Sequence, residues 1–132
     1  MIDGKANWIY RRSQNPEAAI RISDPNRLSS SDHVVAVKFD YAGKDGEVGR
    51  GGTYTLTIDD RAIASTRIDR TVPYIYSVDE TLDIGEDHGT PIIEDYADRM
   101  PFMFDGKIDS VAIDLGPMQI GKRSDPEKND LE

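Results

Sequence analysis

The stretch TYTLTIDDRAIASTRI, residues 53–68, carries the clearest fold signal in the chain. Tyr54, Leu56 and Ile58 alternate with threonines, and a second run of small and β-branched residues follows Asp59-Asp60. Alternation with a period of two is typical of a strand with one buried face. A two-residue polar turn between two such runs predicts a β-hairpin.

Other segments show the same alternation. In HVVAVKFDY, residues 33–41, apolar side chains at odd positions face away from Lys38 and Asp40. No segment shows a sustained helical period. Several short strands, each with one apolar face, bury that face most simply in an antiparallel sandwich, so the sequence predicts an all-β fold. Further strands are expected over residues 18–22, 71–77 and 107–115.

Composition narrows the functional classes. The chain has 132 residues, which fits one domain, and a net charge of −9, which disfavours nucleic acid as a partner. The absence of cysteine excludes disulfides, thiolate zinc sites and cysteine nucleophiles. No apolar run approaches the roughly 20 residues that span a membrane.

The domain is expected to cover residues 1–120, because the remainder lacks any pattern. Residues 121–132, GKRSDPEKNDLE, are polar and are predicted to form a disordered tail. The closing Leu131-Glu132 and the opening Met1 suggest cloning residues, in which case the chain is the C-terminal fragment of a longer protein.

The acidic stretch DETLDIGEDHGT, residues 79–90, is the main candidate site. An EF-hand starting at Asp83 fails, because its third position is Gly85, which has no side-chain oxygen. An irregular calcium loop of Asp83, Glu86 and Asp87 is an alternative to a surface turn that binds nothing. The glycines and Pro91 favour the turn, because glycine permits positive φ and proline fixes φ.

Catalytic carboxylates and histidine ligands are less well supported. Glu80, Asp83 and Glu86 lie three apart, which on a strand sends neighbours to opposite faces, unlike the spacing of a glycosidase pair. His33 and His88 have no local partner in the sequence and are read as ordinary polar residues. The aromatic residues are assigned to the core, with an exposed sugar-stacking platform as the alternative.

The order of motifs from Gly49 to Gly116 resembles the C-terminal region of bacterial arylsulfatases. It contains GRGGTYTLTIDDRAIASTRIDRTVPYIYSVDETLDIGEDHGTPIIEDY and then PFMFDGKIDSVAIDLG, with a looser match through residues 21–41. Departures are Asp60, where the family places glycine or asparagine, and Tyr74, where it tends to show phenylalanine. The family resembles jelly-roll, concanavalin A-like lectins in architecture.

The resemblance implies a parent enzyme that hydrolyses sulfate esters with calcium and a formylglycine made from cysteine or serine. This chain lacks the matching centre. SDPNR, Ser23 to Arg27, has Asn26 where serine or alanine is usual, and Asp32-His33 replaces the following Thr-Gly. The paired aspartates of IDDRA lie in the hairpin turn, and 132 residues cannot hold the large catalytic domain.

The expected function is therefore a non-catalytic accessory domain without a cofactor of its own. Its partner would be the parent's catalytic domain, contacted through His88, Tyr96 and Phe102, and the parent would act on sulfated carbohydrate or an aryl sulfate. The alternative is a lectin-like carbohydrate-binding module, with calcium as an optional aid to sugar binding. The sequence does not distinguish a periplasmic, secreted or cytoplasmic parent.

Overall fold

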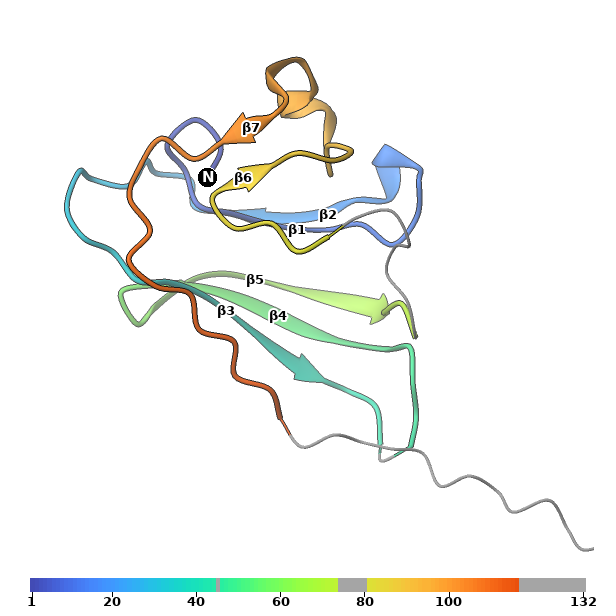
Figure 1. The fold of residues 1–132 in the computed structure, drawn as a ribbon. Coiled ribbons are helices and arrows are strands. Elements are labelled where there is room, and N and C mark those ends of the chain that lie inside the picture. Colours follow the sequence, from blue (N-terminus) through green and yellow to red (C-terminus); the bar gives the residue numbers. More distant parts are fainter. Residues whose placement is uncertain (45, 74–80, 117–132) are drawn as a thin grey trace, which may run out of the picture.

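A computed structural model describes residues 1–44, 46–73 and 81–116 of the chain. The strands in these ranges pair only in antiparallel fashion, so the predicted all-β class is confirmed for them. They form the sheets β1–β2, β3–β4–β5 and β6–β7 (Figure 1). The elements are β1 Asn7–Tyr10, η1 Pro16–Ala18, β2 Ile20–Ser23, β3 Val35–Tyr41, β4 Arg50–Ile58, β5 Arg61–Arg70, β6 Glu86–Asp87, η2 Glu94–Arg99 and β7 Phe102–Met103, where η marks a 3₁₀ helix.

The predicted hairpin joins β4 to β5 in the largest sheet. Its turn residues Asp59 and Asp60 have φ angles of 52° and 62°. Two consecutive positive φ values are typical of the type I′ turn, whose twist matches that of the paired strands. Aspartate enters this left-handed region more readily than most residues because its carboxylate can bond locally. Here the Asp59 carboxylate accepts a hydrogen bond from the backbone N–H of Val34 at 2.9 Å.

The apolar face of this sheet follows the predicted alternation. Val37 lies opposite Leu56, and Phe39 lies opposite Tyr54. Gly52 allows the Phe39 ring to lie over the neighbouring strand, because a Cβ at Gly52 would be only 2.6 Å from that ring. The hydrophobic pattern therefore sets the register of β3 against β4.

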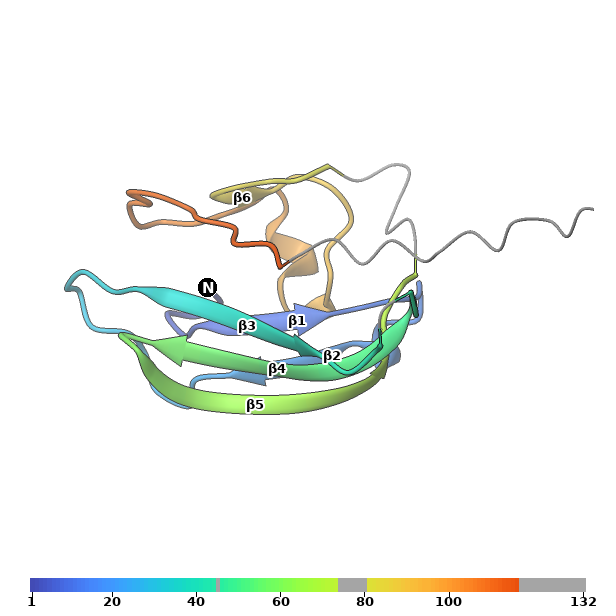
Figure 2. The ribbon, with the colours of Figure 1, turned by 90° about the horizontal axis from the view of Figure 1, so that it is seen from below.

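The first core cluster lies between this sheet and the β1–β2 ribbon. Leu56 is fully buried there with Ala6 and Ile22. The Trp8 ring of β1 stacks on Tyr54, with 3.8 Å between ring centroids. Because β2 also lies beside β5, the two sheets curve around this core (Figure 2).

A second core cluster covers the other face of the ribbon. Ile2, Ile93 and Tyr96 are buried, and Ile9 and Phe102 pack against them. Since successive residues of a strand point to opposite faces, Trp8 reaches the first cluster and Ile9 reaches the second. The ribbon is therefore the layer that connects the large sheet with the segment from β6 to β7.

The strand predicted over residues 107–115 is not found. Within the described ranges these residues form no sheet pairing, and Val111, Ile113 and Leu115 are exposed. The strand predicted over 18–22 is present as β2, displaced by two residues at its start. The one predicted over 71–77 begins with residues 71–73 outside any strand, and its remainder lies outside the described residues, as does the predicted tail at 121–132.

The strand pairings establish antiparallel sheets without establishing a jelly-roll order of strands. Among the described residues, no helix has the length and apolar character needed to cross a membrane.

Candidate functional site

The described part of the acidic stretch forms a turn followed by a short strand. Gly85 has a φ of +86°, whereas Gly89 does not enter the left-handed region. The strand β6 that follows Gly85 pairs with β7, and the N–H of Phe104 donates to the Gly85 carbonyl at 2.8 Å. This geometry supports the interpretation of the stretch as a chain reversal. Its first residues, Asp79 and Glu80, lie outside the described residues.

The three carboxylates predicted as calcium ligands make separate local interactions. Asp83 accepts a long hydrogen bond of 3.4 Å from the N–H of His88. Glu86 lies 2.7 Å from the His88 ring, and Asp87 accepts a 2.8 Å hydrogen bond from the Tyr96 hydroxyl. No group of three or more acidic or histidine side chains in the described ranges is placed to hold a metal. The described structure therefore does not bring these three carboxylates together, and a calcium loop at Asp83, Glu86 and Asp87 stays a prediction.

A hollow of about 420 Å³ lies beside this turn. Ile2, Ile9 and Phe102 contribute apolar side chains to it, while Asp83 and Glu86 contribute carboxylates. Ligand sites are typically apolar hollows with a few polar groups. The hollow brings together residues from the N-terminus, β1 and the acidic stretch that are far apart in the sequence.

The three residues predicted to face a catalytic domain differ in exposure. Tyr96 is only 4% exposed, and its ring stacks on Phe102 with 4.4 Å between centroids. Burial raises the pKa of Tyr96 to about 12, which keeps its hydroxyl protonated as a donor to Asp87. Tyr96 and Phe102 thus help to form the chain's own second core cluster, while His88 lies on the surface. Their contact with another domain stays a prediction.

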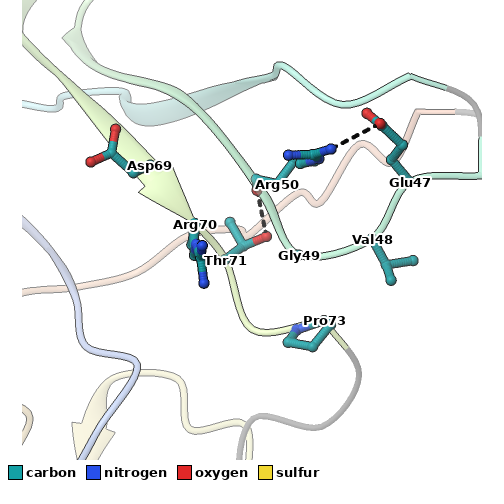
Figure 3. Close-up of a pocket in the computed structure, with 8 residues that line it drawn as sticks. All are labelled: Glu47, Val48, Gly49, Arg50, Asp69, Arg70, Thr71 and Pro73. Atoms are coloured by element: carbon teal, nitrogen blue, oxygen red, sulfur yellow. Dashed lines mark hydrogen bonds and ion pairs between the residues drawn. The ribbon is translucent and has the colours of Figure 1, made fainter.

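A second hollow, of about 460 Å³, lies at the end of β4 and β5 that is remote from the hairpin turn (Figure 3). Arg50 and Arg70 lie directly opposite each other across these strands, an arrangement that like charges disfavour. Glu47 lies 3.1 Å from Arg50 and offsets part of that repulsion. The backbone N–H of Lys44, and then Arg50, hold the pKa of Glu47 below its usual value. With Asp69 also in the lining, acidic and basic side chains balance, so the hollow has no strong preference for anions.

The structure contains a polar network at the hairpin turn that the sequence did not predict. His33 Nδ1 lies 2.8 Å from Asp59 Oδ2, and His33 Nε2 lies 2.9 Å from Ser29 Oγ. Ser31 Oγ lies 2.7 Å from Ser29 Oγ. The hydrogen bond with Asp59 raises the pKa of His33, and the same bond lowers the pKa of Asp59. A predicted pairing of residues 33–41 with β4 would have indicated this site. Because Val35 lies opposite Ile58, the residues just beyond that pair, His33 and Asp59, come close together.

The segment that superficially fits the sulfatase modification core forms a turn. Ser23 is the last residue of β2, and Asp24 is buried, with its carboxylate accepting a hydrogen bond from the N–H of Asn26 at 2.8 Å. This use of Asp24 is that of an Asx-turn.

Comparisons with protein-family models, curated proteins and solved structures give no match to this chain.

Proposed function

We propose that this chain is a non-catalytic C-terminal accessory domain of an arylsulfatase-like sulfuric ester hydrolase. In this proposal it is a jelly-roll, concanavalin A-like β-sandwich that packs on the parent's catalytic domain and supports it. The order of motifs between Gly49 and Gly116 supports the family, and the antiparallel sheets and the hairpin turn at Asp59-Asp60 are compatible with it.

The observation that carries the proposal is that the apolar side chains of residues 111–115 are exposed to solvent. Ile113 is 67% exposed and Leu115 is 83% exposed, and Val111 is exposed with them. Burying one such side chain contributes roughly 1.5–3 kcal/mol, so leaving several in water forgoes a substantial part of a domain's stability. Adjacent exposed apolar side chains mark interaction sites in soluble proteins.

The edge strand β3 adds a second uncovered surface. Val37 is 41% exposed although it shares a face with the buried Leu56, and Val35 is exposed as well. Within the described sheet nothing pairs with the outer edge of β3, and an open edge is a template for a further strand. In Figure 2, β6 and residues 104–116 lie on the core side of the large sheet. Additional polypeptide there would complete a second layer and cover both surfaces.

The first test is the coding sequence upstream of Met1. We expect a continuous reading frame with a Cys/Ser-x-Pro-x-Arg motif followed by Thr-Gly and a large catalytic domain. A different upstream frame, or a stop codon next to Met1 in the native gene, would refute the proposal.

A second test uses the protein joined to that upstream region. Ile113→Lys is expected to weaken packing of the domain, increasing protease cleavage between the two parts and reducing hydrolysis of p-nitrophenyl sulfate. Ser110→Lys is the matched control, because Ser110 is exposed and polar in the same segment. Equal behaviour of the two variants would argue against docking through this segment.

The lectin-like alternative and intrinsic sulfatase activity are tested on the chain alone. The rings of Trp8 and Tyr54 stack on each other, which leaves them less suited to a sugar platform. Calorimetric titration with calcium and with sulfated oligosaccharides should give no heat of binding under the accessory-domain proposal. Turnover of p-nitrophenyl sulfate that is lost in Ser23→Ala would instead assign catalysis to this chain.

A further inference from the structure

We propose that Ser29, His33 and Asp59 form a reactive serine site, in which Ser29 accepts an acyl group from activated esters. Ser29 is the nucleophile, His33 the general base and Asp59 the positioning residue. The site lies at the hairpin end of the large sheet and is independent of the arylsulfatase resemblance. The proposed accessory domain is non-catalytic toward sulfate esters, and the Ser29 site would act on carboxylic esters instead.

The hydrogen bonds give each group a defined role. The Asp59 carboxylate accepts from Val34 N–H through Oδ1 and lies 2.8 Å from His33 Nδ1 through Oδ2. A proton on Nδ1 leaves Nε2 as the acceptor for the Ser29 hydroxyl, 2.9 Å away. A serine bonded to a base that a third group orients is the arrangement that activates serine nucleophiles.

The backbone fixes the carboxylate. Asp59 is the first residue of the left-handed turn, with a φ of 52°, and its own N–H donates to the Val34 carbonyl at 2.9 Å. Val34 and Asp59 therefore bond each other through backbone and side chain. These two hydrogen bonds hold the Asp59 carboxylate next to His33, which lies two residues before the start of β3.

The base and the nucleophile differ in exposure, as a nucleophilic site requires. The His33 side chain is only 19% exposed, whereas Ser29 is exposed to solvent. The ring is thus partly covered, while the oxygen that would attack is accessible. Ser31 Oγ lies 2.7 Å from Ser29 Oγ and 3.3 Å from His33 Nε2, so Ser29 is the nearer of the two hydroxyls at the ring nitrogen.

His88 provides an internal comparison. Its Nε2 lies 2.7 Å from Glu86, so it too has a carboxylate partner. Among the described residues no serine hydroxyl is bonded to that ring. Reactivity confined to the His33 site would therefore depend on the complete arrangement and not on a histidine–carboxylate pair.

The acyl-transfer step balances with the chain's own groups and the ester. Ser29 Oγ forms a bond to the ester carbonyl carbon while its proton passes to His33 Nε2. The bond from that carbon to the alkoxy oxygen then breaks, and the leaving alkoxide takes the proton from Nε2. Water, activated by the same nitrogen, hydrolyses the acyl-serine and restores the hydroxyl.

The experiment uses the full chain and a fluorophosphonate probe, with intact-mass detection and peptide mapping. Serine attack forms a P–O bond, breaks the P–F bond and releases fluoride, and the proton leaves through His33. We expect a single label on Ser29. His33→Ala is expected to lower the labelling rate by about 100-fold, the size of a general-base contribution.

Control variants distinguish labelling at Ser29 from labelling elsewhere. Ser30→Ala and His88→Ala should label like the unmodified chain, whereas Ser29→Ala should not label. Asp59→Asn preserves the left-handed turn and should shift the pH midpoint of labelling downward, because Asp59 raises the pKa of His33. Circular dichroism and His33→Gln separate loss of the base from loss of fold. Absence of label from the folded chain, label on Ser31 instead, or equal rates in His33→Ala would overturn the proposal.

Discussion

The large sheet and the segment from residue 81 to residue 116 use the same kinds of residues with different results. Across β3 and β4, Val37 lies opposite Leu56 and Phe39 lies opposite Tyr54, and Leu56 becomes fully buried. In the later segment the strands β6 and β7 are two residues long. Residues 107–115, which alternate as clearly as β3 does, join no sheet in the part of the chain that the structure describes.

The difference shows that alternation predicts which side chains share a face of a strand. It does not predict which other strand pairs with it. The strands β4 and β5 are adjacent in the sequence and are joined by a two-residue turn, with a register shift between Leu56 and Thr57. Residues 107–115 have no such neighbouring strand among the described residues. In the later segment Tyr96 packs in a cluster with Ile2 and Phe102.

The largest contrast should come from truncating apolar side chains in the two regions. Leu56→Ala is expected to lower the free energy of unfolding by about 2–5 kcal/mol, because it opens a cavity in the core. Ile113→Ala in the isolated chain should change it by less than about 0.5 kcal/mol, because the side chain is exposed. Urea unfolding monitored by tryptophan fluorescence measures both. A loss above 2 kcal/mol for Ile113→Ala would mean that the segment is packed in solution.

Two glycines sharpen the comparison at the level of the backbone. Gly52→Ala is expected to cost about 1–3 kcal/mol, the range for overpacking, because its Cβ would meet the Asp40 carbonyl oxygen at 2.4 Å and the Phe39 ring. Gly116→Ala is the control, since nothing lies within 4 Å of a Cβ there. Thermal unfolding of both variants tests this. A tolerated Gly52→Ala would show that β3 and β4 can move apart at Gly52.

Tyrosine hydroxyls provide a smaller, local test. The Tyr96 hydroxyl donates to Asp87 and accepts from Ile92 N–H, so Tyr96→Phe should cost about 1 kcal/mol. Hydrogen exchange should show the loss at the Ile92 amide and in β6. Tyr41→Phe is the counterpart in the large sheet, because that hydroxyl donates to the Glu47 carbonyl and accepts from Arg50 N–H. Faster exchange throughout β4 in Tyr96→Phe would indicate that the two regions unfold as one unit.

The smallest expected effect is the pH dependence of the His33–Asp59 pair. The raised pKa of His33 stabilises the fold fully below about 6.5, its ordinary value, and this is lost as pH rises through the raised value. The lowered pKa of Asp59 stabilises the fold above about 3.9, and this is lost as pH falls through the lowered value. The thermal midpoint of the unmodified chain minus that of His33→Asn should therefore be largest between these values. A difference that is constant from pH 3 to pH 9 would contradict the pairing.

Sequence patterns predicted well where the interaction is local. The hairpin at Asp59-Asp60 and the apolar face of β3 followed from alternation and turn chemistry, and both are confirmed. The network of His33 with Asp59 was missed because 26 positions separate them, although the strand pairing makes them neighbours. The proposed interface residue Tyr96 lies in the chain's own core, which its sequence neighbourhood did not indicate.

The sequence by itself determined the all-β class, the hairpin and the polar turn in the acidic stretch. These depend on side-chain alternation and on backbone conformations that glycine and aspartate permit, which are local properties. Only the tertiary structure decided which apolar faces are buried and which charged groups form pairs. Burial and hydrogen bonding between distant residues depend on how strands are brought together, and the same alternating pattern that is buried in β4 is left exposed at residues 111–115.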